Sequence, residues 1–232
     1  MNDQLDALVI APHPDDAEIG MGGAIVKMLA AGKRVGILDL TNGEPTPFGT
    51  PEIRAREKER ASEVLGVKWR RNLGLPNRRL EANLENRALL AGVIRETRPA
   101  HLYAPYWVDA HPDHLAALDL IEAARFWAKL TKSDLPFEPF HPKRIYNYFC
   151  VHLHLAVQPA FILDISDAWP VKRRSLECYE SQFILGKADR VPSFIEQREI
   201  QAAYWGQLIG VRYGEPFACR EPLGLSDLSK LV

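Results

Sequence analysis

Two short clusters of histidine and aspartate carry the residue types of a metal-dependent active site. The first, His13–Asp16 (HPDD), directly follows an apolar run at 7–12, and the second, His111–His114 (HPDH), follows a shorter run at 101–104. Imidazole and carboxylate both suit Zn²⁺, and catalytic zinc usually has three protein ligands and one water. Two histidines and one aspartate would complete such a set, leaving one histidine and one of the two other aspartates for proton transfer.

Each of these side chains also has a simpler interpretation when it is taken alone. Asp15 or Asp16 could cap a helix that begins near Glu18. Asp113 could stabilise the first turn of a later helix, and His111 could be a solvated loop residue. The two clusters together, each at the end of an expected strand, favour a site, because a motif counts only in its structural context.

The elements that must position these clusters alternate along the chain. Apolar runs predict strands at 7–12, 35–40, 67–72, 101–104, 145–151 and 161–165, and 3.6-residue patterns predict helices at 18–31, 51–65, 84–97, 112–128, 167–180 and 194–207. This order indicates an α/β fold, a Rossmann-like and mostly parallel sheet flanked by helices on both faces, in a single domain over 1–232. Ligands bind beyond the carboxyl ends of such strands, so the two clusters could meet there.

Composition and charge narrow the class of protein. The 232 residues include 29 basic and 30 acidic side chains, so nothing in the net charge of −1 suggests a nucleic acid or an anionic membrane as partner. The first residues carry no basic region of a secretory signal, and no apolar run is long enough to span a membrane. Cys150, Cys178 and Cys219 lie far apart and form no C-x-x-C pair, as is typical of reduced, packed thiols. We therefore expect a cytoplasmic protein.

Several other segments, together with the two clusters, are similar to one protein family. They make the chain resemble the LmbE-like (PIG-L) N-acetylglucosamine deacetylases over nearly its whole length; the segments are 18–20, 39–44, 49–54, 72–76, 179–183 and 214–217. The resemblance is greatest to the deacetylases of bacillithiol biosynthesis, which act on N-acetylglucosaminyl malate. It also implies a homo-oligomer, commonly a hexamer.

The resemblance implies roles for the residues of the two clusters. His13, Asp16 and His114 match the zinc ligands of the family, so one Zn²⁺ per chain is expected. Asp15 matches its general base, and His111 matches the histidine that stabilises the oxyanion or donates a proton. Asp113 is expected only to orient an imidazole.

The resemblance also implies that Arg54 holds the substrate. Without the resemblance, the simpler interpretation of Arg54 is a surface helix residue beside Glu57 and Lys58. The chain departs from the family at two positions near the expected sugar site. Ala110 stands where many relatives have arginine, and Asn77 stands where many have aspartate. Both departures leave the zinc chemistry untouched and put the exact substrate in question.

The expected reaction is hydrolysis of the acetamide of an N-acetylglucosamine-type sugar, a small-molecule substrate, to acetate and a free amine. One alternative is a metal-dependent amidase for a non-sugar substrate. Another is a nucleotide-binding module, suggested by Gly20, Gly22 and Gly23. These glycines do not match G-x-G-x-x-G and lie inside an expected helix, so close packing of that helix on a strand is the better interpretation.

Overall fold

The computed structural model describes residues 4–185, 187 and 190–224, which form a seven-stranded sheet. Its strands follow the order β3-β2-β1-β4-β5-β7-β6; they are β1 (Ala7–Ala11), β2 (Val35–Thr41), β3 (Trp69–Leu75), β4 (His101–Pro105), β5 (Arg144–Tyr148), β6 (Phe161–Asp164) and β7 (Gly214–Ala218). The first five strands in this order run parallel, and β7 is antiparallel to both of its neighbours. The expected mostly parallel sheet is confirmed.

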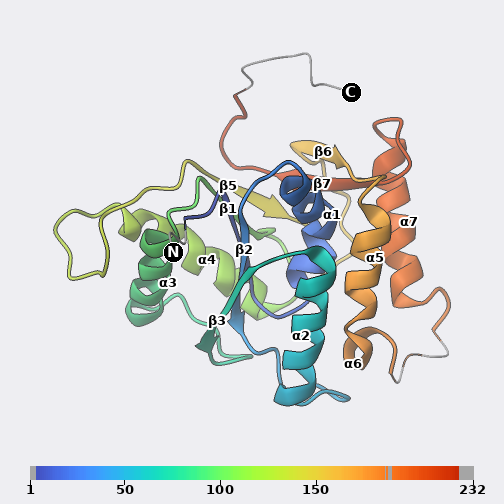
Figure 1. Cartoon of the computed structure of the whole chain (residues 1–232), viewed down its shortest axis with the longest axis horizontal. Coiled ribbons are helices and arrows are strands. Elements are labelled where there is room, and N and C mark those ends of the chain that lie inside the picture. Colours follow the sequence, from blue (N-terminus) through green and yellow to red (C-terminus); the bar gives the residue numbers. More distant parts are fainter. Residues whose placement is uncertain (1–3, 186, 188–189, 225–232) are drawn as a thin grey trace.

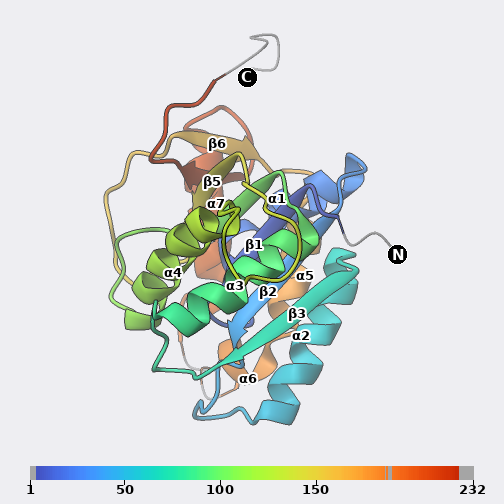
Figure 2. The same ribbon diagram turned by 90° about the vertical axis from the view of Figure 1, so that its left-hand side faces the viewer.

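Helices cover both faces of this sheet; they are α1 (Asp16–Ala30), α2 (Pro51–Leu65), α3 (Leu84–Thr97), α4 (Pro112–Ala128), α5 (Trp169–Glu177), α6 (Glu180–Phe183) and α7 (Phe194–Gln207). Figure 1 shows α3 and α4 on one side and α1, α2, α5 and α7 on the other. Seen from the side in Figure 2, α3 and α4 lie in front of the strands. None of the helices in the described part of the chain combines the length and apolar character that a membrane span requires.

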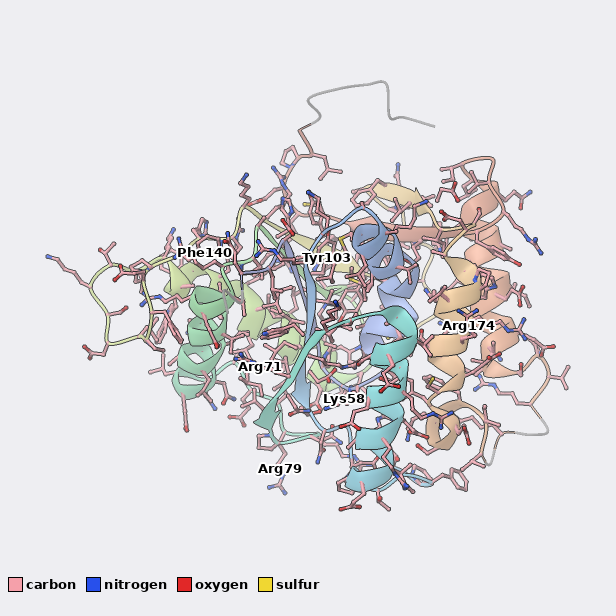
Figure 3. All side chains as sticks on the ribbon, viewed as in Figure 1. Lys58, Arg71, Arg79, Tyr103, Phe140 and Arg174 are labelled. Atoms are coloured by element: carbon pink, nitrogen blue, oxygen red, sulfur yellow. The ribbon has the colours of Figure 1, made fainter. Side chains whose placement is uncertain are left out.

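Each face of the sheet has its own hydrophobic layer. One layer packs α3 and α4 on the strands around Leu8, Ile10 and Leu102, and the other packs α1 on Val9 and Ile37. β1 is buried along its whole length and contributes to both layers, as its continuous apolar run predicts. Tyr103 of β4, labelled in Figure 3, lies in the α1 layer, where its hydroxyl is 3.7 Å from the Met28 sulfur.

The structure corrects the expected elements at two places. β7 was not predicted, because its five residues include Gly214 and Pro216, which are both unfavourable in strands. The single helix expected at 167–180 is divided into α5 and α6, because Tyr179 leaves the helical conformation. The ring of Tyr179 is fully buried and its hydroxyl donates to Glu18 Oε1 at 2.9 Å, so tertiary contacts override helix propensity there.

Helix α1 is broken at Met21, and a buried ion pair completes the hydrogen bonds at the break. Glu215 of β7 accepts from the amides of Gly23 and Ala24 at 2.8 and 2.7 Å. Lys172 of α5 donates to the Ile19 carbonyl at 2.8 Å and to Glu215 at 2.6 Å. The pair therefore fixes the first turns of α1, which begin with Asp16, the last residue of the HPDD cluster.

The glycines of α1 allow neighbouring elements to approach closely. A Cβ atom on Gly20 would collide with the ring of Tyr148 in β5, and one on Gly23 would lie 2.7 Å from Ile165. These glycines thus allow close packing of α1 and do not form a phosphate-binding loop, as was expected from the sequence.

Candidate active site

The two histidine clusters meet at one edge of the sheet. β1 and β4 are parallel neighbours, with Ala7 paired to His101, so their carboxyl ends lie side by side. The ring centroids of His13 and His111 are 4.8 Å apart, and those of His13 and His114 are 5.5 Å apart. Residues a hundred positions apart in the sequence thus form one polar cluster.

His13, Asp16 and His114 present a donor set that fits one divalent ion. Asp16 Oδ2 lies 3.1 Å from His13 Nδ1 and 3.3 Å from His114 Nε2, and the ligand atoms of all three residues lie within 4.8 Å of one another. Tetrahedral zinc with bonds of about 2.0–2.1 Å separates its ligand atoms by about 3.3 Å. His114 Nε2 is buried and makes no hydrogen bond within the described residues, as is expected of an atom that serves a metal.

A carboxylate lies at the other ring nitrogen of each of these histidines. Asp113 Oδ2 is 3.2 Å from His13 Nε2, and Asp109 Oδ2 is 2.6 Å from His114 Nδ1. Such carboxylates fix the tautomer and the orientation of metal-binding imidazoles. This orienting contact was expected of Asp113 but not of Asp109, whose only signal in the sequence is its position two residues before the second cluster.

Asp109 also joins the cluster to the segment that follows β5. Its Oδ1 accepts from the backbone amides of Ala110 at 2.6 Å and His152 at 2.9 Å. In the same segment, the buried thiol of Cys150 donates to Asp16 Oδ1 at 3.0 Å. Cys150 and His152 were not singled out from the sequence as site residues, because no spacing relates them to either cluster.

Asp15 forms an ion pair with Arg54 beside the metal cluster. Its Oδ2 is 2.9 Å from Arg54 Nη2, and both side chains are buried. Asp15 stands at the N-terminus of α1, but its side chain makes no capping hydrogen bond, so the cap interpretation is wrong for this residue. Its φ of 119° lies in the left-handed region, at a cost of about 1–3 kcal/mol for a residue other than glycine.

The two adjacent aspartates differ in proton affinity. Burial raises the pKa of Asp15 to about 7; Arg54 opposes this shift and Asp16 adds to it. Burial acts on Asp16 in the same direction, but His114 and His13 outweigh it and hold the pKa of that carboxyl well below its usual range. Asp15 can therefore exchange a proton near neutral pH, whereas Asp16 stays a carboxylate.

His111 is a neutral hydrogen-bond donor and not a solvated loop residue. It is the N-cap of α4, where its Nδ1 accepts from the amide of Asp113 at 3.2 Å, so the ring proton of the neutral form is on Nε2. Burial and the positive charges of His114 and His13 lower the pKa of His111 to about 4. At neutral pH the ring can thus donate from Nε2 without carrying a charge.

Arg54 is 4% exposed, so the surface-helix interpretation is wrong. Besides the bond to Asp15, its Nε and Nη1 are buried and have no hydrogen-bond partner among the described residues. Asn77 donates to the Glu44 carbonyl at 2.9 Å, and its Oδ1 is likewise buried without a partner in that part of the chain. Arg54 and Asn77 both line a cavity at the cluster. Two donors of Arg54 and one acceptor of Asn77 are therefore available to a ligand there.

The cluster opens into a cavity of about 1260 Å³. It is lined by His13, Asp15 and His111 of the cluster, by the segment after β5 and by residues of α7. Ala110 is exposed and is not among the described lining residues. The volume exceeds what one sugar ring requires, and the cavity can therefore take a larger conjugate.

A buried network of charged side chains joins α1 to the strands next to the histidine clusters. Arg70 of β3 donates to both carboxylate oxygens of Asp39 at 2.9 Å and to Glu18 Oε1 at 2.6 Å. These three side chains are nearly inaccessible. The network ties β2 and β3 to the first turns of α1.

Comparisons with known proteins agree with this geometry. The sequence model of the PIG-L family, described as GlcNAc-PI de-N-acetylase, matches residues 8–125. A diacetylchitobiose deacetylase of Thermococcus kodakarensis is 34% identical over 92% of this chain and 82% of its own length. A probable N-acetyl-alpha-D-glucosaminyl L-malate deacetylase 2 of Bacillus anthracis is 30% identical over 53% of this chain and 61% of its own. The crystal structure of a conserved protein from Thermus thermophilus superposes with a TM-score of 0.89 and 40% identity, over 98% of this chain and 100% of that one.

Proposed function

The chain belongs to the PIG-L family, and on this basis we propose that it is a zinc-dependent hydrolase that removes the acetyl group from an N-acetylglucosamine-type sugar or its conjugate. The observation that carries the proposal is the arrangement of His13, Asp16 and His114 around one point, with Asp15 and His111 on the wall of the same cavity. The products are acetate and a free amine.

The metal site uses two imidazole nitrogens and one carboxylate oxygen, a set that suits zinc and leaves room for water or substrate. When bound, zinc would lower the pKa of a water toward about 7 and polarise the acetamide carbonyl. Asp109 and Asp113 hold the two ligand rings in place through their remaining nitrogens.

Asp15 acts as the general base and takes the proton of the attacking water, because its raised pKa matches proton transfer near neutral pH. His111 donates a hydrogen bond from Nε2 to the oxygen that gains negative charge, a role for which a neutral imidazole with a fixed tautomer is suited. Because its lowered pKa keeps His111 neutral at neutral pH, the leaving amine takes its proton from Asp15.

The free hydrogen-bonding atoms of the cavity support a sugar as the substrate. Nε and Nη1 of Arg54 can donate to ring hydroxyls, and Oδ1 of Asn77 can accept from one. The relatives named above act on diacetylchitobiose and, for the Bacillus anthracis protein, on N-acetylglucosaminyl malate. We propose that this chain takes an acetylated aminosugar of the same kind.

The test is an acetate-release assay on the metal-free and the zinc-loaded protein. The substrates are N-acetylglucosamine, N,N'-diacetylchitobiose and N-acetylglucosaminyl malate, and His114→Ala is the metal-deficient control. We expect about one zinc per chain after mild dialysis and acetate release only by the loaded parent. If the fully loaded parent releases no acetate from any of them, the proposal is wrong.

We further propose that the chain functions in the cytoplasm as a homo-oligomer, with a hexamer as the expected assembly. The free thiols of the three cysteines support the first point, and the family resemblance supports the second. Light scattering on the eluted protein measures the assembly directly.

A further inference from the structure

Asp113 contacts a segment of the cavity wall as well as a histidine of the metal cluster. Its Oδ2 accepts from the backbone amide of Arg78 at 2.7 Å, and its Oδ1 accepts from that of Leu80 at 3.3 Å. The same Oδ2 lies 3.2 Å from His13 Nε2. One carboxylate, on a residue that is 2% exposed, therefore joins an expected zinc ligand to residues 77–80, called here the 77–80 segment.

The inward-facing amides of the 77–80 segment find their acceptors in Asp113. The segment belongs to the connection between β3 and α3, and no backbone carbonyl of the described residues accepts from the amides of Arg78 and Leu80. The backbone of Arg78 is left-handed, with a φ of 62°, and a residue other than glycine keeps this conformation only where its surroundings hold it. Arg79, between the two bonded amides, is exposed and points away from the molecule (Figure 3).

The 77–80 segment carries residues that a ligand in the cavity can touch. Asn77 and Arg78 both line the cavity. Asn77 donates to the Glu44 carbonyl at 2.9 Å, and its buried Oδ1 has no partner in the described chain. Arg78 Nη2 donates to the Pro45 carbonyl at 2.6 Å. A shift of the segment would therefore move the free acceptor of Asn77 relative to the metal cluster.

The backbone of Asp113 contacts a third part of the site. Its amide donates to Nδ1 of His111, the expected donor to the oxyanion, at 3.2 Å. Asp113 thus contacts a metal ligand, the oxyanion donor and the cavity wall. These three parts must keep fixed positions relative to one another if an acetamide at the metal and a hydroxyl at the wall are to be bound together.

We propose that Asp113 is a positioning residue for the substrate, which holds the 77–80 segment where Asn77 can accept from a sugar hydroxyl. Because one carboxylate oxygen contacts both His13 and Arg78, a shift of either would cost a buried hydrogen bond. The inference rests on the proposed function and adds a task in substrate binding to a residue that was expected only to orient an imidazole.

Hydrogen exchange in the zinc-loaded protein tests the contact itself. In Asp113→Ala the amides of Arg78 and Leu80 lose a charged acceptor, so we expect peptides that cover residues 74–82 to exchange about 10–100-fold faster at these two positions than in the parent. Asp113→Asn keeps one acceptor oxygen, and its exchange rates should lie between those of the parent and Asp113→Ala. Peptides from α3 should exchange as in the parent, which separates the local effect from a folding defect.

Turnover tests the effect on the substrate. KM is measured at saturating zinc with the substrate that the parent cleaves best among N-acetylglucosamine, N,N'-diacetylchitobiose and N-acetylglucosaminyl malate. Asp113→Ala and Asn77→Ala should each raise KM by about 2- to 10-fold, the effect of losing one neutral hydrogen bond. Because Asp113 acts through Asn77, the double variant should have the KM of Asn77→Ala and not the product of the two increases.

Asp109→Ala is the matched control. Asp109 orients the ring of the other histidine ligand, His114, and accepts from the backbone amide of His152 on a different segment. Loss of this carboxylate disturbs the metal site in the same way, but in the zinc-loaded form it should leave the exchange of the 77–80 segment as it is in the parent.

The outcomes that would contradict the proposal are distinguishable from a failure of the proposed function. The positioning role is wrong, and the deacetylase function stands, if Asp113→Ala exchanges as slowly as the parent at Arg78 and Leu80, or if its KM is unchanged. It is also wrong if the two KM increases multiply in the double variant, or if Asp109→Ala speeds the same amides equally. If the loaded parent releases no acetate from any of the three substrates, the deacetylase function is wrong and the role in substrate binding falls with it.

Discussion

Asp109 should control the affinity of the protein for zinc, although it is not a ligand. Its Oδ2 is 2.6 Å from His114 Nδ1, and both side chains are 1% exposed. Hydrogen bonds from His114 and His152 outweigh the effect of burial and hold the pKa of Asp109 well below its usual range, so the group is a carboxylate when His114 binds metal. Removal of such a partner typically costs about 10–100-fold in metal affinity.

The size of the loss should depend on what replaces the carboxylate. Asp109→Asn keeps an oxygen that can accept from Nδ1 but lacks the charge, so we expect a loss of about 10-fold. Asp109→Ala removes the acceptor as well and leaves a buried imidazole N–H without a partner, and the loss should approach about 100-fold. The affinity is measured by competition with a chromophoric chelator for Zn²⁺ at neutral pH.

Asp119→Asn is the control for this experiment. Asp119 belongs to the same helix, α4, but is exposed, and its substitution should leave the zinc affinity unchanged. If Asp109→Ala binds zinc as tightly as the parent while His114→Ala does not, the carboxylate does not act through the imidazole and the reasoning is refuted.

Three other variants test the remaining assignments. Asp15→Asn should keep its zinc and lose about 10²–10⁴-fold in kcat, whereas Asp16→Asn should be zinc-poor. Zinc content and kcat are measured for both variants, and the reversed pattern would mean that the two aspartates have each other's role. Arg54 lowers the pKa of Asp15, and a base must be deprotonated to act, so Arg54→Gln should move the acid limb of kcat/KM to higher pH; an unmoved limb would separate Arg54 from the base. Arg70→Met leaves two buried carboxylates uncompensated and should lower the free energy of unfolding in urea by about 3–5 kcal/mol, and a change under about 1 kcal/mol would contradict this.

The sequence predicted best what depends on local pattern. The apolar runs located β1 and β4, and because parallel neighbours end at the same edge, the two histidine clusters were expected to meet. The periodic segments likewise predicted α3, α4 and α7 with the bounds that the structure has.

What the sequence did not reveal depends on the path of the chain in three dimensions. Asp109 is a single acid in a loop, and only the folded loop brings it to His114. Cys150 and His152 reach the site from the end of β5, at no fixed spacing from either cluster. Burial of Arg54 was equally hidden, because a charged residue on an amphipathic helix has the same local pattern whether it faces water or a cavity.

The position of β7 has a consequence for synthesis on the ribosome. β7 lies between β5 and β6, and within the described chain β7 is the only strand with which β6 pairs. Glu215 of β7 also accepts the two backbone hydrogen bonds at the break in α1, near the HPDD cluster. At ordinary elongation speed, the nascent chain waits roughly 3–13 s between the emergence of Tyr148, the end of β5, and that of Gly214, the start of β7. During that interval the edge of β5 is unpaired and open to other strands, so the nascent chain carries an aggregation-prone edge until β7 arrives.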